Sequence, residues 1–352
     1  MPEEASPSIT RQIILGAPQI LAPASGEIVP LAEVIEGEVL EDVDAQAPLD
    51  IHAAFAEFLR LDVANGDATA DTIAAYEREV IMWAKWCQGQ GVRPESVRRP
   101  HIVAYREEMK AQGLSVATRS HKLSIVRRFY EAAVQAGLMD GNPASGVKGG
   151  KDLTPGEEKI KALTHNALYL LAQSIPGDTL LGRRDRAIVA LMAVHGLRRV
   201  EVARLDEESL EEDGATASLV VHGKGGRIRR VFLRPDTHAA LHAYLCAKRE
   251  GSYASGGALF VSHSNRTRGG RISRRSLNDI VDGYLSASAL KKAGVSCHAL
   301  RHTFGTLAVA GGAKVEHLRD AMGHSRLETT GLYVKAIERV KNNPANFIDV
   351  EF

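Results

Sequence analysis

The chain has 352 residues, of which 44% are hydrophobic and 25% charged, a composition that argues against a fibre. Its length suits two domains of the usual ~100–200 residues. No apolar run approaches the ~20 residues of a membrane span, and the start, Met-Pro-Glu-Glu, lacks the features of a secretion signal. Three widely spaced cysteines predict free thiols in a reducing compartment, so we expect a cytoplasmic protein with no membrane partner.

The net charge of +1 is distributed unevenly along the sequence. Residues 1–50 hold ten acids and one base, which leaves a net charge of +10 in 51–352. A basic body favours a polyanionic partner, although a solvated basic surface without a partner is the alternative. Residues 1–48 lack aromatic residues and are rich in Pro, Ala, Glu and Gly, so they predict a disordered acidic tail. Such a tail either restrains non-specific DNA binding or only aids solubility.

Apolar residues recur three or four positions apart between Asp50 and Gly146. They predict four helices, one with Pro100 in its first turn and one capped by Ser115, in a compact all-α domain over 49–146. The last of these helices has a basic flank that could contact phosphates, although such a run is more often a solvated face. Its residues are Arg119, Lys122, Arg127 and Arg128.

Prolines and glycines interrupt the helical pattern around Lys148, which predicts a basic linker at 147–160. Helical patterns then return, and two β-branched runs predict a hairpin over 218–233. Ala258–Ser262 predicts a short strand. We therefore expect a second domain over 161–340, mainly helical with a small β-sheet.

Four side chains near the end of the chain suggest phosphoryl chemistry. His298 and Arg301 are three apart, so they share one face of a helix, and a guanidinium binds phosphate through paired hydrogen bonds. His324 follows in a Gly-His pair, and Tyr333 lies nine residues further on. His298 and His324 can either hydrogen-bond the phosphate or handle the tyrosine proton. A tyrosine close to such a cluster is a potential covalent nucleophile toward phosphorus.

Cleaving a phosphodiester also requires charge neutralisation and a proton for the leaving oxygen. Arg198 begins a predicted helix, and Glu201 is placed to orient its guanidinium, although the two could form an ordinary helix ion pair. Lys224, at the tip of the hairpin, suits a general acid but could be a plain turn residue. Arg227 on the same hairpin is a candidate for DNA contact.

The residues around His298 allow two other interpretations. His302 is four residues from His298, a spacing that could bind zinc, but no cysteine pair or following Glu completes such a site. We therefore expect no metal and assign His302 to packing or support. Cys297 could be a thiol nucleophile, but a cysteine of this kind is more often small and buried.

Six residues in chain order resemble the active-site signature of the tyrosine recombinases, the family of phage integrases, Xer-type recombinases and Cre. They are Arg198, Lys224, His298, Arg301, His324 and Tyr333. The matching stretches are HGLRRVEVARL, HGKGGRIRRVFL, HALRHTFGTLAVAGGA, AMGHS and TTGLYVK. The earlier helices are similar to that family's SAM-like core-binding domain, so the resemblance covers roughly 50–340. The implied fold is a four-helix DNA-binding domain followed by an α+β DNA breaking-rejoining domain. Six functional positions in the right order make the resemblance specific.

The resemblance implies the reaction and the assembly. Tyr333 would form a 3′-phosphotyrosyl link and release a 5′ hydroxyl, with no metal, ATP or other cofactor. Four protomers on double-stranded DNA recombination sites would exchange strands through a Holliday junction, and they would be monomeric or weakly associated without DNA. The apolar segment 341–352 would be exchanged between protomers. The sequence does not distinguish integration, excision and resolution, and it does not identify accessory proteins.

Two alternatives remain, a type IB topoisomerase and a catalytically silent DNA-binding protein of the same fold. The helical domain and the apolar tail favour a recombinase over a topoisomerase. The sequence also departs from the family pattern before the nucleophile, where Gly331 loosens a predicted helix by roughly 1 kcal/mol. We expect a mobile segment that withdraws Tyr333 until neighbouring protomers assemble.

Overall fold

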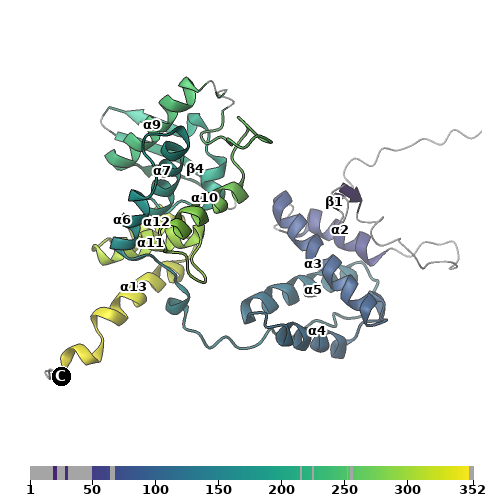
Figure 1. Ribbon diagram of the computed structural model, residues 1–352. Coiled ribbons are helices and arrows are strands. Elements are labelled where there is room, and N and C mark those ends of the chain that lie inside the picture. Colours follow the sequence, from purple (N-terminus) through teal and green to yellow (C-terminus); the bar gives the residue numbers. More distant parts are fainter. Residues whose placement is uncertain are drawn as a thin grey trace, which may run out of the picture. The chain divides into compact units, whose positions relative to one another are not determined.

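The computed structural model describes residues 19–21, 28–30, 50–63, 68–214, 216–223, 226–251, 253 and 257–348. The chain forms two compact units, Met1–Lys151 and Asp152–Phe352, which are described separately (Figure 1). In the described part of the chain, no helix has the length and apolar character needed to cross a bilayer.

The first unit contains the predicted helices. They are α2 (Ile51–Leu61), α3 (Ala70–Gly89), α4 (Arg99–Ala111) and α5 (Val116–Gln135), with a 3-10 turn, η2 (Pro94–Ser96), before α4. Asp50, Thr69 and Ser115 cap α2, α3 and α5 with their side-chain oxygens, which satisfies amides that a helix start leaves unpaired. Pro100 lies in the first turn of α4, so both sequence-based expectations about helix starts are confirmed.

An aromatic cluster holds this unit together. The Trp83 ring is fully buried, and its indole N–H donates to Tyr130 Oη at 3.2 Å. Tyr130 in turn donates to Pro94 O at 3.0 Å, so both polar atoms of the cluster are satisfied. Because Trp83 is on α3 and Tyr130 on α5, these contacts fix the two long helices against each other.

Six residues of the segment expected to be a disordered tail form two short strands. Strands β1 (Gln19–Leu21) and β2 (Ile28–Pro30) pair antiparallel, with Ile20 opposite Val29. Branched and apolar residues favour extended strands, which explains pairing within an otherwise acidic segment. The rest of the predicted tail lies outside the described residues.

The second unit is mainly helical, with one small sheet (Figure 1). Its helices are α6 (His165–Gln173), α7 (Leu180–Ala193), α8 (Arg199–Arg204), α9 (Pro235–Glu250), α10 (Arg274–Ala287), α11 (Cys297–Ala310), α12 (Val315–Met322) and α13 (Leu327–Lys341). Short 3-10 turns are η3 (Gly156–Lys159), η4 (Glu207–Ser209) and η6 (Pro344–Phe347). The apolar helix α7 packs against α9 and α11 and buries Ile188, Leu191 and Met192 at the centre of the core.

The sheet has the antiparallel order β3 (Leu210–Asp213), β4 (Thr216–His222), β5 (Ile228–Phe232). The predicted hairpin is β4–β5, with Val220 opposite Arg230. Strand β3 was not expected, because its acidic sequence LEED lacks an apolar alternation. Lys224, at the hairpin tip, lies outside the described residues.

The strand predicted at Ala258–Ser262 is wrong. Only isolated bridges form there, from Ala258 to Asp206 and from Val261 to Arg271. The buried ammonium of Lys248 donates to Ala258 O at 2.6 Å, so a side chain takes a carbonyl that a continuous ladder would use. The two bridges also reach different partners, and neither extends into a strand.

A sharp turn joins α12 to α13. Gly323 ends α12 with a φ of 61°, a left-handed conformation that suits glycine, and His324 N donates back to Arg319 O at 3.0 Å. After the turn, α13 contacts α11 and α12 through its first half and then extends away from them (Figure 1). Arg339 near its end pairs with Glu158 of η3 at 2.7 Å.

Candidate active site

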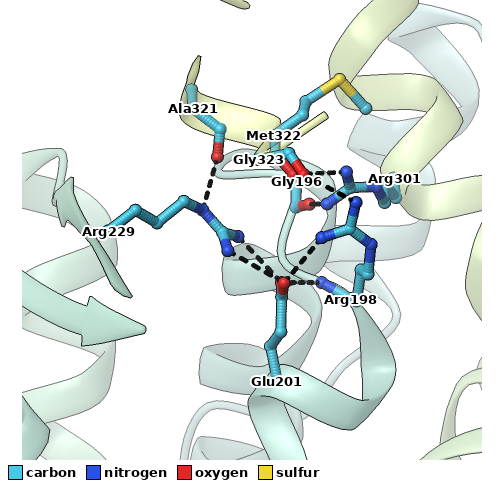
Figure 2. Close-up of polar contacts among 8 residues, drawn as sticks. All are labelled: Gly196, Arg198, Glu201, Arg229, Arg301, Ala321, Met322 and Gly323. Carbon is cyan, nitrogen blue, oxygen red and sulfur yellow. Dashed lines mark hydrogen bonds and ion pairs between the residues drawn. The ribbon is translucent and has the colours of Figure 1, made fainter. Parts of the chain in front are cut away.

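Glu201 is a buried carboxylate shared by two arginines. Its side chain is 1% exposed, and Oε1 lies 2.8 Å from Arg198 Nη1. Arg229 of β5 donates to both carboxylate oxygens, at 2.9 and 2.8 Å (Figure 2). Burial acts to raise the pKa of Glu201, but the hydrogen bonds and charges of Arg229 and Arg198 outweigh it and hold the pKa below its usual value. The carboxylate therefore stays ionised and orients both guanidinium groups.

Three consecutive carbonyl groups at the end of α12 each accept a hydrogen bond from a different arginine (Figure 2). The pairs are Arg229 Nε with Ala321 O at 3.0 Å, Arg301 Nη2 with Met322 O at 2.5 Å, and Arg198 Nη2 with Gly323 O at 3.1 Å. Arg301 also donates to Gly196 O and is 2% exposed, whereas the Arg198 side chain is 29% exposed. These contacts fix the planes of the guanidinium groups, and Arg198, the most exposed of the three, keeps further N–H groups for a ligand.

Arg229 was missed by the sequence analysis, which selected Arg227 from the same hairpin. Arg227 is exposed, whereas the Arg229 side chain is only 14% exposed. Arg230, next to it, is also exposed. Residue type alone therefore does not separate Arg229 from the other arginines of the hairpin. Side chains alternate between the two faces of a strand, and this alternation could have identified Arg229, which lies within β5. Arg227 precedes the strand, so the alternation does not apply to it.

The three histidines have different environments. His298 is exposed, and its ring centroid lies 4.6 Å from that of His302, one turn along α11. His324 Nδ1 lies 2.9 Å from Thr330 Oγ1 of α13. Burial, reinforced by nearby positive groups including Arg301, lowers the pKa of His302 and of His324 to about 4. Both imidazoles are therefore neutral at physiological pH.

Tyr333 is a buried residue of α13, with 3% of its surface exposed. Its hydroxyl lies 3.0 Å from His302 Nδ1, and its ring lies parallel to that of His324, at 7° and 6.5 Å between centroids. Burial raises the pKa of Tyr333, while the charges of Arg301 and Arg198 oppose that rise. The phenol is thus neutral and lies in the field of the two predicted phosphate-binding arginines of its own subunit.

The thiol of Cys297 is buried beside this site. Burial raises its pKa to about 12, and its sulfur lies 3.4 Å from Met192 Sδ in the core. A protonated, buried thiol is a poor nucleophile. Cys297 is therefore a packing residue, as its type suggested.

Several of the predicted DNA contacts serve the first unit itself. Arg119 Nε donates to Gly149 O at 2.9 Å, and Arg127 Nη2 donates to Val147 O at 2.8 Å. Lys122 forms an ion pair with Glu79. These contacts hold the segment after α5 and join α5 to α3, so the three side chains have structural roles. The other two residues predicted in this unit, Arg128 and Lys148, are exposed.

A cavity of about 250 Å³ lies where α5 meets this segment. It is lined by Ser120, Arg127, Val147, Lys148, Gly149 and Gly150. A Cβ at Gly149 would lie 2.9 Å from Ser120 Cα, so only glycine fits there. Among the described residues, none accepts a hydrogen bond from the amides of Lys148, Gly149 or Gly150. Unpaired amides next to a guanidinium and an ammonium favour an anion.

Comparison with known proteins agrees with this architecture in both units. The model of the phage integrase family matches residues 158–339, and that of the phage integrase N-terminal SAM-like domain matches 55–137. The tyrosine recombinase XerD of Mycobacterium leprae is 30% identical over 278 residues, which are 75% of this chain and 86% of the relative. XerC of Myxococcus xanthus is 32% identical over 224 residues, 62% of this chain and 71% of the relative.

Solved structures show the same fold. XerH bound to a palindromic difH substrate in a post-cleavage complex aligns with a TM-score of 0.65 at 17% identity, over 83% of this chain and 84% of that one. The Tn1549 transposon integrase with transposon right-end DNA aligns with a TM-score of 0.61 at 17% identity, over 84% of this chain and 99% of that one.

The fold and the family matches define a DNA strand-transfer enzyme with a SAM-like domain and a catalytic domain. The chain belongs to the phage integrase family, the tyrosine recombinases, which cleave and rejoin DNA by transesterification in site-specific recombination. The predicted fold class is therefore confirmed.

Proposed function

We propose that Tyr333 attacks the scissile phosphate, forms a 3′-phosphotyrosyl link and releases a 5′ hydroxyl. The observation that carries this proposal is the turn between α12 and α13. Arg301 and Arg198 bind the carbonyls of Met322 and Gly323, and the next residue, His324, stacks on Tyr333. One short segment thus links two phosphate-binding groups to the candidate nucleophile.

The proposed roles follow from charge and exposure. Arg198 and Arg301 neutralise the nonbridging oxygens, held in position by Glu201 and by backbone carbonyls. His298 and His324 hydrogen-bond the phosphate, and Lys224 protonates the leaving oxygen. The link to tyrosine conserves the energy of the phosphodiester, so the reaction needs neither ATP nor a metal cofactor.

Strand exchange then proceeds through a Holliday junction. We propose four protomers on two DNA sites, with the segment 341–352 exchanged between neighbours and little association without DNA. Exposed apolar residues support this assembly, because Phe347 is 78% and Ile348 66% exposed. Exposed side chains of this size suit a protein contact.

The first unit is proposed to bind duplex DNA through backbone phosphates. We assign 49–146 to core-binding, 147–160 to a linker, 161–340 to catalysis and 1–48 to an acidic tail. The cavity beside α5 offers Lys148, a partly exposed Arg127 and unpaired amides to one phosphate. Arg128, and Arg227 in the second unit, are exposed and add further phosphate contacts.

A covalent trapping experiment tests the reaction. Sites are first recovered from a genomic DNA library by sequencing the fragments that become attached to the protein. On a nicked half-site carrying such a sequence, the wild type should form a denaturant-resistant adduct that Tyr333→Phe abolishes. Tyr169→Phe is the matched control, because that tyrosine is 60% exposed on α6.

Two results would contradict the assignment of Tyr333 as the nucleophile. A wild-type protein that gives no adduct, or a Tyr333→Phe protein that still does, contradicts the assignment. Resolution of a synthetic Holliday junction tests the second step. Relaxation of supercoiled DNA without site preference would instead indicate topoisomerase activity.

A further inference from the structure

The hydroxyl of Tyr333 has a specific partner. Among the described residues, only His302 hydrogen-bonds it, through Nδ1 at 3.0 Å. Gly305, three positions further along α11, provides room for the ring, since a Cβ there would lie 2.7 Å from Tyr333 Cζ. Residues three apart share a helix face. This face of α11 therefore receives the tyrosine ring at Gly305 and its hydroxyl at His302.

The other two imidazoles are differently engaged. His324 faces the tyrosine ring with its own ring, and its Nδ1 is bonded to Thr330 Oγ1. His298 is exposed and contacts His302, and no hydrogen bond joins it to Tyr333 among the described residues. Geometry thus distinguishes His302 from the histidines that the family signature selects.

The resting protonation states place a neutral imidazole beside a protonated phenol, while both pKa shifts oppose transfer between them until phosphate is bound. Burial first, and then the charges of His298 and Arg301, lower the pKa of His302 to about 4, so one ring nitrogen is free to accept a proton. Burial raises the pKa of Tyr333, so the resting phenol keeps its proton. A phosphate bound by Arg301 would offset the positive charge that acts on His302 and make the imidazole a better base when DNA is present.

We propose that His302 accepts the proton of Tyr333 as the phenol oxygen attacks phosphorus, an inference that rests on the proposed role of Tyr333 as nucleophile. The O–H bond of Tyr333 breaks and its proton moves to His302 Nδ1, while a bond forms between the phenol oxygen and phosphorus. The bond from phosphorus to the 5′ oxygen breaks, and that oxygen takes a proton from the general acid. In rejoining, an incoming 5′ hydroxyl attacks phosphorus and gives its proton to the deprotonated general acid. The bond from phosphorus to the phenol oxygen breaks, and the imidazolium returns its proton to the departing phenolate.

The test measures single-turnover adduct formation on a nicked half-site. His302→Ala should slow adduct formation by ~10²-fold or more, the range for loss of a general base. His302→Asn should be similarly slow, because its amide can hydrogen-bond the phenol but cannot take its proton. His317→Ala is the matched control, since His317 is exposed on α12, and it should cleave at the wild-type rate.

A second substitution separates proton transfer from packing. Replacing Tyr333 by 3,5-difluorotyrosine lowers the phenol pKa, which should speed His302→Ala by roughly tenfold or more and the wild type much less. Equal acceleration of both proteins, or wild-type rates in either the Ala or the Asn variant, would overturn the proposal. DNA affinity equal to the wild type shows that each variant is folded. A wild type without any Tyr333 adduct would instead reject the proposed function itself.

Discussion

Arg229 of β5 and Glu201 of α8, 28 residues apart in sequence, form a bidentate ion pair with N–O distances of 2.9 and 2.8 Å. The same carboxylate binds Arg198, and the same guanidinium binds the carbonyl of Ala321. Arg229 thus connects the hairpin that carries Lys224 to the turn that precedes α13. The two ends of the proposed catalytic set depend on one residue outside the signature.

Removing Arg229 should therefore affect both stability and cleavage. Arg229→Ala leaves Arg198 as the only side-chain partner of the buried Glu201 among the described residues. The free energy of unfolding, measured by urea denaturation, should fall by about 3 kcal/mol. Adduct formation should fall because the turn before α13 loses its hydrogen bond from the hairpin to Ala321 O. Arg230→Ala is the control, since its pair with Glu211 is about half exposed and should contribute less than about 1 kcal/mol. Equal losses in the two variants would contradict the role of Arg229.

Arg198→Ala should separate cleavage from binding. Its guanidinium is proposed to stabilise charge at the reacting phosphate, so the adduct rate should fall by ~10²–10³-fold. Half-site affinity, measured by fluorescence anisotropy, should change far less. Arg204→Ala, an exposed residue at the end of the same helix, should alter neither quantity. Cleavage by Arg198→Ala at the wild-type rate would remove Arg198 from the site.

Lys148→Ala should weaken DNA binding through charge alone. If Lys148 binds one phosphate at the cavity beside α5, the slope of log affinity against log salt should fall by about 0.9. Lys85→Ala, exposed on α3, is the control and should leave the slope unchanged. Arg127→Ala should in addition lower the melting temperature, because its guanidinium holds the carbonyls of Ala144 and Val147.

Two glycines test how α13 holds its tyrosine. Gly305→Ala should abolish cleavage while leaving DNA affinity intact, because the added methyl collides with the Tyr333 ring and forces α13 away from α11. Gly331→Ala meets no atom within 4 Å and should only stiffen the helix before Tyr333. We expect Gly331→Ala to change the rate of adduct formation. An unchanged rate would argue against a mobile nucleophile segment.

The exposed apolar end of the chain should be needed for assembly. Replacing Phe347 and Ile348 together by serine should prevent tetramer formation on paired sites while preserving binding to a single half-site, as seen in gel-shift and sedimentation experiments. Leu153→Ser is the control, since Leu153 is 78% exposed but far in sequence from the tail. Tetramers that survive the double change would contradict protomer exchange through this segment.

Local spacing in the sequence was sufficient to predict the helices of the first unit, the β4–β5 hairpin and the family signature. Helix caps, turns and the order of Arg198, His298 and Tyr333 depend on neighbours in the chain, so a single sequence contains them. The strand at Ala258–Ser262 failed because a remote lysine, Lys248, takes one of its carbonyls.

Tertiary structure alone identified the contacts that join remote segments. Arg198 reaches Gly323 across 125 residues, and His302 reaches Tyr333 across 31. Hydrogen bonds of this kind depend on how helices pack, which no local periodicity encodes. The sequence determined which chemical groups this recombinase carries. The fold decided that Arg229 joins Glu201 in holding Arg198, and that His302, which the sequence assigned only to packing or support, contacts the tyrosine hydroxyl.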